Sequence, residues 1–163
     1  MLHSDLIAPI PELLRRHAEA RGSKVAYRDA ASAITYAQLN ERTGRLGGHL
    51  VDLGLAPGDT VAILLPNSVQ WVEACYAIAR AGAIGVPISY DATEPEIAYR
   101  LGDANCRAIV TTAERGELVA KLKAGAPNLK TVIATDRGTT STDVLRYTQL
   151  LASAPKSPPR DPA

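Results

Sequence analysis

Cysteine is scarce in this sequence, which contains two cysteines among 163 residues. Cys75 and Cys106 could form one disulfide at most, and each lies in an apolar or mixed segment. Small secreted domains depend on several disulfides, whereas cytoplasmic proteins keep their thiols reduced. We therefore expect a reduced, cytoplasmic protein.

Net charge and long apolar runs are also scarce. The formal net charge is +1, so no electrostatic footprint indicates nucleic acid or an anionic membrane as a partner. The longest stretch without a charged residue, residues 60–72, is well short of a membrane span. The N-terminus, MLHSDLIAPIPELLRRH, lacks the basic start and long apolar core of a secretion signal. We expect no nucleic-acid partner and no transmembrane segment.

Recognisable catalytic motifs are missing too. The chain contains no GxGxxG after a strand, no GxxxxGK[ST], no GxSxG and no HExxH. Its acidic residues are dispersed, and none is paired with a histidine or a second carboxylate as an acid–base couple. His3, His17 and His49 are scattered without metal-ligand spacing, so no protein-bound metal is expected.

What the chain does have is strong apolar patterning. At 163 residues and 46% hydrophobic, it is long enough for one well-cored domain and short for two. Apolar residues at helical spacing predict an N-terminal helix: Ile10, Leu13, Leu14 and Ala18. Strand-like pieces follow at KVAYRD and AITY. A second helix is predicted to begin at the capping-box pair Thr35 and Gln38 and to end at Gly54.

Three glycines lie inside this second helix. Gly44, Gly47 and Gly48 each cost roughly 1 kcal/mol relative to alanine in a helix. They could form a ligand loop or allow close packing of the helix on the sheet. Packing is favoured, because the apolar spacing continues through the glycines, and it places Gly47 on the packed side.

From residue 59 onward, apolar strands alternate with helices. Strands are predicted at residues 61–65, 83–86, 108–110 and 132–134, with helices at 68–81, after Thr93, and at 113–123. Strands without internal alternation, separated by helices, favour an α/β fold: a mainly parallel sheet with helices on both faces. Pro87 cannot donate to a sheet ladder, so its strand should end there or lie near an edge.

The carboxyl ends of these strands are polar, and a ligand of an open α/β sheet binds beyond such ends. They read Pro66-Asn67-Ser68, Pro87-Ile88-Ser89-Tyr90-Asp91, Thr111-Thr112 and Thr135-Asp136-Arg137. Helix capping is the favoured role of their side chains: Asn67 with Gln70, Thr93 with Glu96, and Thr112 are interpreted as N-caps. No residue is assigned to catalysis, cofactor binding or a metal.

Taken together, three segments carry a resemblance: ITYAQL at 34–39, LGLAPGDTVAILLPNSVQWVEACYAIARAGAIGVPIS at 53–89, and EPEIAYRLGDANCRAIVT at 94–111. In order and spacing they resemble the N-terminal portion of the adenylate-forming superfamily. That superfamily contains acyl-CoA synthetases, luciferases and peptide-synthetase adenylation domains. The GAIGVPIS and PEIAYRL forms look most like a fatty acyl-CoA synthetase.

The resemblance implies a two-step reaction for the complete enzyme. A carboxylate, such as a fatty acid, attacks the α-phosphate of ATP in the presence of Mg²⁺, and coenzyme A then displaces AMP from the acyl adenylate. The family's phosphate loop, of the type YTSGTTGxxKG, does not occur in this chain. Basic residues after the strand that corresponds to AIVT contact coenzyme A in some relatives. Arg115, Lys121 and Lys123 do not match that pattern and are interpreted as a solvated helix face.

The resulting hypothesis is an N-terminal fragment of a fatty acyl-CoA synthetase, inactive by itself and without a bound cofactor. Residues 1–152 would form the N-terminal α/β subdomain, and the proline-rich residues 153–163 a linker to the missing phosphate-loop region. A dimer through a surface exposed by truncation would be consistent with this. Two alternatives stay open: a stand-alone binding or regulatory module, and an unrelated doubly wound nucleotide-binding protein.

Overall fold

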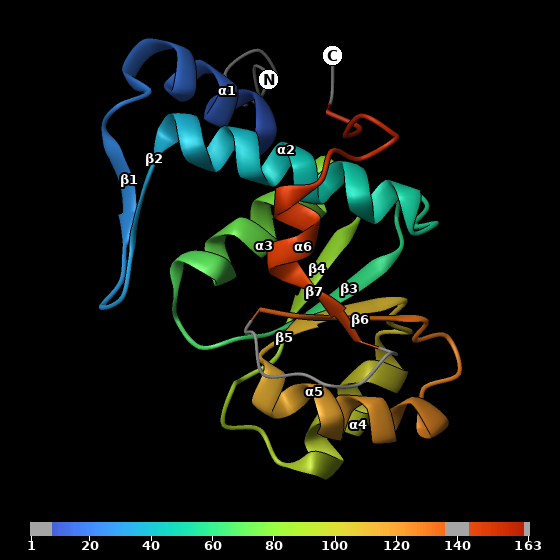
Figure 1. Ribbon diagram of the computed structural model, residues 1–163. Helices are drawn as coiled ribbons and strands as arrows, with labels where there is room; N and C mark the ends of the chain where they lie inside the picture. Colours follow the sequence, from blue (N-terminus) through green and yellow to red (C-terminus); the bar gives the residue numbers. More distant parts are fainter. Residues whose placement is uncertain (1–7, 136–143, 162–163) are drawn as a thin grey trace, which may run out of the picture.

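The computed structural model describes residues 8–135 and 144–161 (Figure 1). The helices are α1 (Ile10–Arg21), α2 (Tyr36–Asp52), α3 (Val69–Arg80), α4 (Glu94–Asp103), α5 (Ala113–Leu122) and α6 (Tyr147–Ala152), with a 3-10 turn at Lys123–Gly125. The strands are β1 (Val25–Arg28), β2 (Ala33–Thr35), β3 (Thr60–Leu64), β4 (Ile84–Pro87), β5 (Ala108–Thr111), β6 (Thr131–Ala134) and β7 (Val144–Arg146).

Five parallel strands form the central sheet in the order β4-β3-β5-β6-β7. The parallel sheet and the four strands expected from residue 59 onward are confirmed. The fifth strand, β7, was not predicted, because three residues are too few to show a pattern. Pro87 ends β4, which is an edge strand, so the prediction made for this proline is confirmed as well.

Helices cover both faces of the sheet (Figure 1). On one face, α2, α3 and α6 pack over Val61 and Ile63 of β3 and Val110 of β5. On the other face, α4 and α5 pack over Ala62 and Leu64. Successive β3 residues therefore serve opposite cores, and both sets are apolar because neither face meets water.

A smaller unit precedes the sheet. Strands β1 and β2 pair antiparallel, and β2 leads directly into α2. The Thr35–Gln38 capping box at this junction is confirmed by both of its hydrogen bonds, Gln38 N to Thr35 Oγ1 and Thr35 N to Gln38 Oε1. Leu14, Ile34 and Val69 form a third apolar cluster that joins α1 and the hairpin to α3.

Gly47 lies on the packed side of α2, close to a neighbouring backbone, as predicted, but Gly44 and Gly47 face α3 and not the sheet as expected. A β-carbon built on Gly47 would lie 3.1 Å from the Ala77 carbonyl oxygen of α3 and 3.2 Å from Arg80 Cβ. One built on Gly44 would lie 3.1 Å from the Arg80 guanidinium. The two helices therefore approach closely enough that only glycine fits without rearrangement.

Replacing Gly47 with leucine should destabilise the domain by roughly 1–3 kcal/mol through overpacking, although leucine is the better helix former. Gly102→Leu is the matched control, since a β-carbon on Gly102 of α4 would meet nothing within 4 Å. Chemical denaturation of both variants measures the difference. A Gly47→Leu protein as stable as the parent would contradict the packing of α2 against α3.

Candidate functional site

A hollow of about 440 Å³ lies beyond the carboxyl ends of β3 and β4. It is lined by Leu65, Pro66, Asn67, Trp71, Pro87, Ile88, Ser89, Tyr90 and Asp91. Two of the polar strand ends singled out in the sequence, 66–68 and 87–91, are thereby brought together.

The topology places a crevice beside this hollow, between the carboxyl ends of β3 and β5. From β3 the chain continues to α3 on one face of the sheet, whereas from the neighbouring β5 it continues to α5 on the other face. Connections that diverge from adjacent strands leave a crevice at their carboxyl ends, where open α/β sheets bind ligands. The hollow borders that crevice through the segment 66–67.

The capping role predicted for Asn67 is wrong. Ser68 caps α3 instead, since its side chain accepts a hydrogen bond from Trp71 N at 3.2 Å. A second cap comes from the β1–β2 turn, where Asp29 Oδ2 accepts from Val69 N at 2.8 Å. Residues three positions apart could pair from either Asn67 or Ser68, and the sequence did not show which begins the helix. Within the described residues, the exposed Asn67 side chain has no hydrogen bond and lines the hollow.

The other predicted caps are present. Glu96 accepts from Thr93 N at 2.7 Å and from the Thr93 hydroxyl at 2.8 Å, and Thr112 accepts from Arg115 N at 3.4 Å. At the end of the fourth predicted strand, Thr135 donates its N–H to Thr111 O. Asp136 and Arg137 lie outside the described residues.

Tyr90 links the hollow to the end of β5. Its hydroxyl lies 3.0 Å from Thr112 Oγ1 and 3.4 Å from Glu114 Oε2. Arg115 is half-buried, donates to Tyr90 O at 3.1 Å and lies 5.3 Å from the centre of the Tyr90 ring. Arg115 is thus not part of a solvated helix face, as the sequence interpretation had it, because it holds the β4–α4 loop.

The two cysteines are poor candidates for a nucleophile. Burial raises the pKa of the Cys75 thiol to about 11 and also raises that of Cys106. Both are free thiols, and a protonated thiol is a poor nucleophile. Hydrogen bonds from Val69 N and Ala31 N lower the pKa of Asp29, which keeps this cap of α3 ionised. No group of three metal-ligating side chains occurs within residues 8–135 and 144–161.

One buried carboxylate was missed in the sequence. Glu73 is fully buried in α3, and it accepts hydrogen bonds from Arg42 of α2 and from the Tyr147 hydroxyl of α6. Desolvation and the neighbouring Glu73 raise the pKa of Tyr147 well above its ordinary value. The three side chains satisfy one another and join three helices, which is a structural role.

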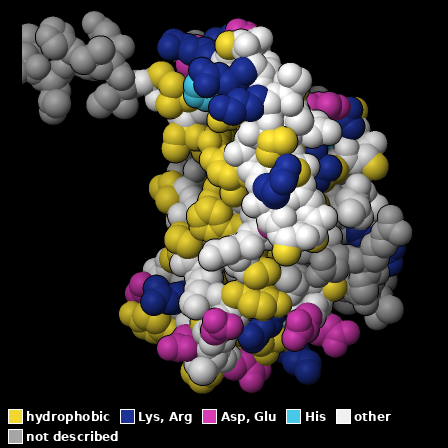
Figure 2. All heavy atoms as spheres, turned by 90° about the vertical axis from the view of Figure 1, so that its left-hand side faces the viewer, with side chains coloured by type: hydrophobic (Ala, Val, Ile, Leu, Met, Phe, Trp, Pro, Cys, Tyr) yellow, Lys and Arg dark blue, Asp and Glu magenta, His cyan; other side chains and the backbone are white. Residues whose placement is uncertain are grey.

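An apolar groove lies between α1 and α3. Figure 2 shows apolar side chains gathered in a stripe on this face of the molecule. Ile10 and Leu13 of α1, with Cys75, Tyr76 and Ala79 of α3, line a hollow of about 180 Å³. The one polar atom of these side chains besides sulfur, the Tyr76 hydroxyl, lies 3.4 Å from the Tyr27 hydroxyl. The groove thus lacks the convergent polar groups that orient a small ligand.

The described helices include none long and apolar enough to cross a membrane.

Comparison with known proteins gives the family. The family model described as "AMP-binding enzyme" matches residues 14–163. The chain belongs to the AMP-binding enzyme family. Members of this family form adenylates, which agrees with the resemblance carried by residues 34–39, 53–89 and 94–111.

Several relatives are named as enzymes that form acyl-CoA. A medium/long-chain-fatty-acid–CoA/3-oxocholest-4-en-26-oate–CoA ligase of Mycobacterium marinum is 32% identical over 155 residues, or 93% of this chain and 28% of the relative. A feruloyl-CoA synthase of Amycolatopsis is 37% identical over 110 residues, or 68% of this chain and 22% of the relative. The crystal structure of a protein described as a long-chain-fatty-acid CoA ligase, from Rhodopseudomonas palustris, matches with a TM-score of 0.84 and 27% identity, covering 96% of this chain and 38% of that one.

The chain spans less than a third of the curated relatives it matches. The shared part is the N-terminal α/β region, and its likeness to solved adenylate-forming enzymes confirms the predicted fold class.

The cap that Ser68 provides for α3 should contribute to the stability of the domain. Ser68→Ala should cost about 1 kcal/mol of unfolding free energy, because Trp71 N loses its acceptor. Asn67→Ala, one residue earlier, should leave the stability unchanged, since no hydrogen bond is lost. Thermal melts of the two variants beside the parent provide the comparison. The opposite order of stabilities would restore Asn67 as the cap.

Proposed function

We propose that this chain is the N-terminal part of an ATP-dependent fatty acyl-CoA ligase. The observation that carries the proposal is the alignment with the Mycobacterium marinum fatty-acid–CoA ligase. It extends over 93% of this chain and leaves most of the relative outside the match. Residues 1–152 would be the N-terminal subdomain, and residues 153–163 would lead into the phosphate-loop region.

The proposed reaction has two steps. The fatty-acid carboxylate attacks the α-phosphate of ATP, and the bond from the α-phosphate to the bridging oxygen breaks to release pyrophosphate. The thiolate of coenzyme A then attacks the acyl carbonyl, and AMP leaves. Both steps need cationic or N–H groups around the phosphates, with Mg²⁺ to offset their charge.

The hollow described above does not fit a triphosphate. Its charged lining residue is Asp91, an acid, and its lining contains no lysine or arginine. The first N–H groups of α3, which could otherwise hold an anion, already donate to Asp29 and Ser68. ATP, Mg²⁺ and coenzyme A are therefore assigned to the remainder of the longer protein, and this chain to its scaffold and pocket wall. The chain alone is expected to be inactive.

Aromatic acids are the second candidate substrate class, because the Amycolatopsis relative is a feruloyl-CoA synthase. Fatty acids are favoured, since the fatty-acid relative aligns over 155 residues against 110 for the feruloyl enzyme. A stand-alone binding module is less favoured, and family membership argues against an unrelated nucleotide-binding protein. The two free thiols are consistent with a cytoplasmic protein.

The test is ATP–pyrophosphate exchange by the protein encoded by the full reading frame, assayed with fatty acids and with ferulate. We expect Mg²⁺-dependent exchange with fatty acids, followed by acyl-CoA formation when coenzyme A is added. Exchange with ferulate alone would move the substrate to the aromatic class. Absence of exchange with every carboxylate, or a reading frame that stops at Ala163, would contradict the proposed function.

A further inference from the structure

The proline-rich segment after α6 is docked on the domain. Residues 153–161 lie across α2 (Figure 1). Pro155, Ser157 and Pro159 are half-buried, whereas the residues between them are exposed, which is the alternation of an extended segment with one face on a surface. We call residues 153–161 the strap.

Gly48, the third glycine of α2, lies where the strap crosses the helix. A β-carbon built on Gly48 would lie 2.5 Å from Ser157 O and 2.6 Å from Pro155 Cγ. A real β-carbon does not approach a backbone oxygen so closely, so any other residue at position 48 would push the strap away. The missing side chain at Gly48 leaves space on α2 in which the strap packs.

Backbone anchors hold the middle of the strap. Asp52, the last residue of α2, accepts hydrogen bonds from Lys156 N at 2.7 Å and Ser157 N at 2.9 Å. Farther along, Arg160 donates from Nη1 to Leu55 O and to Ala81 O, both at 2.8 Å. These bonds fix the register of the strap on the helix as well as its presence there.

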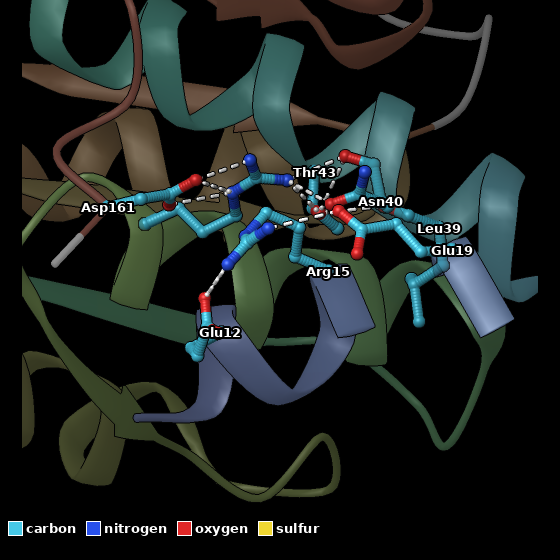
Figure 3. Close-up of polar contacts among 8 residues, drawn as sticks. Glu12, Arg15, Glu19, Leu39, Asn40, Thr43 and Asp161 are labelled. Atoms are coloured by element: carbon cyan, nitrogen blue, oxygen red, sulfur yellow. Dashed lines mark hydrogen bonds and ion pairs between the residues drawn. The ribbon is translucent and has the colours of Figure 1, made fainter. Parts of the chain in front are cut away.

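A buried charge holds the end of the strap. Arg80 is 7% exposed at the end of α3, and its Nε and Nη2 donate to the Asp161 carboxylate at 2.9 and 2.6 Å. Its Nη1 donates to Asn40 O at 2.6 Å and to Thr43 Oγ1 at 3.2 Å, both neutral acceptors. Figure 3 shows Asp161 on one side of this cluster, with Asn40 and Thr43 on the other.

Within the described residues, Asp161 is the carboxylate that forms an ion pair with the Arg80 guanidinium. Burying a cation is unfavourable unless it is paired, and a two-point pairing with a planar guanidinium also sets direction. The Thr43 hydroxyl donates to Leu39 O at 2.7 Å, which leaves its lone pairs facing Arg80. The arrangement therefore binds Asp161 in one position.

We propose that the strap sets the position of the polypeptide that follows it, and that Arg80 is a positioning residue of the ligase reaction through Asp161. This inference rests on the proposed function, in which the phosphate-binding part of the protein follows the strap. A loop that must hold ATP phosphates tolerates little displacement, because a shift of about 1 Å can lower a rate on the order of 100-fold.

The test uses two strap variants in the full-length protein, each with a matched control. Gly48→Ala pushes on the strap by contact, and Gly102→Ala is the same change where a β-carbon meets nothing within 4 Å. Asp161→Asn removes the charge that Arg80 needs. Glu41→Gln removes one charge from the exposed pair of Glu41 with Arg45.

Two measurements are made on each variant: amide hydrogen exchange at Ser157 and Arg160, and steady-state ATP–pyrophosphate exchange. In the strap variants we expect faster exchange at both amides, a higher KM for ATP, and a fall in kcat/KM for ATP on the order of 100-fold. The KM for the fatty acid should not change, and both controls should behave as the parent. Simple loss of folded enzyme would lower kcat without moving the KM for ATP.

Release of the strap with unchanged kinetics would overturn the inference, and so would unchanged amide exchange in both strap variants. A fall in kcat alone would assign Arg80 to folding instead. An inactive parent protein would refute the proposed function, and with it the catalytic role of the strap. Hydrogen exchange on the 163-residue chain would still report whether the strap docks.

Discussion

Helix α2 contacts both α3 and the strap along one line of three glycines, and this close approach constrains the rest of the structure. Gly44 and Gly47 face Arg80 and Ala77, and Gly48 faces the backbone of the strap. Because α3 lies so near α2, the buried charges of α3 can reach partners on α2. The glycines weaken the helix locally, and the packing they allow joins two helices and the strap into one layer on the sheet.

Two buried charged groups on α3 use that closeness in different ways. Glu73 pairs with Arg42 and Tyr147, so it connects the helices of a single layer. Arg80 pairs with Asp161, so it connects the layer to a segment that leaves the domain. In each ion pair one partner is buried and the other is partly exposed, and the buried charge is unfavourable if its partner is removed. Glu73 and Arg80 therefore favour the one arrangement of helices and strap in which their partners are within reach. Apolar residues at these positions would not impose that arrangement.

Much of the fold could be predicted from the sequence, because it depends on local patterns. Buried parallel strands were predicted from the continuous apolar runs at residues 61–65 and 108–110, and Thr35 with Gln38 identifies a helix start by spacing alone. The packing role of Gly47 followed from its place within an apolar stripe. These features depend on residues near in sequence, where periodicity and capping chemistry are informative.

The features that were missed depend on residues distant in sequence. Glu73 lies in a helix that is otherwise nearly apolar, and its partners are 31 and 74 residues away. The choice between Asn67 and Ser68 as the cap depends on where the chain turns out of β3. The strap has no apolar periodicity, and its docking depends on Gly48, Asp52 and Arg80. The proline-rich composition predicted a linker. Composition carries no information about contacts with distant residues, so the docking could not be predicted.

We propose that this chain supplies scaffold and pocket wall to a ligase whose phosphate-binding groups lie elsewhere in the protein. Calorimetric titration with ATP and Mg²⁺ tests it most directly, performed on the 163-residue chain and on the full-length protein under the same conditions. We expect saturable binding by the full-length protein and no binding heat from the chain alone. Magnesium-dependent ATP binding by the chain alone, at micromolar affinity, would contradict it.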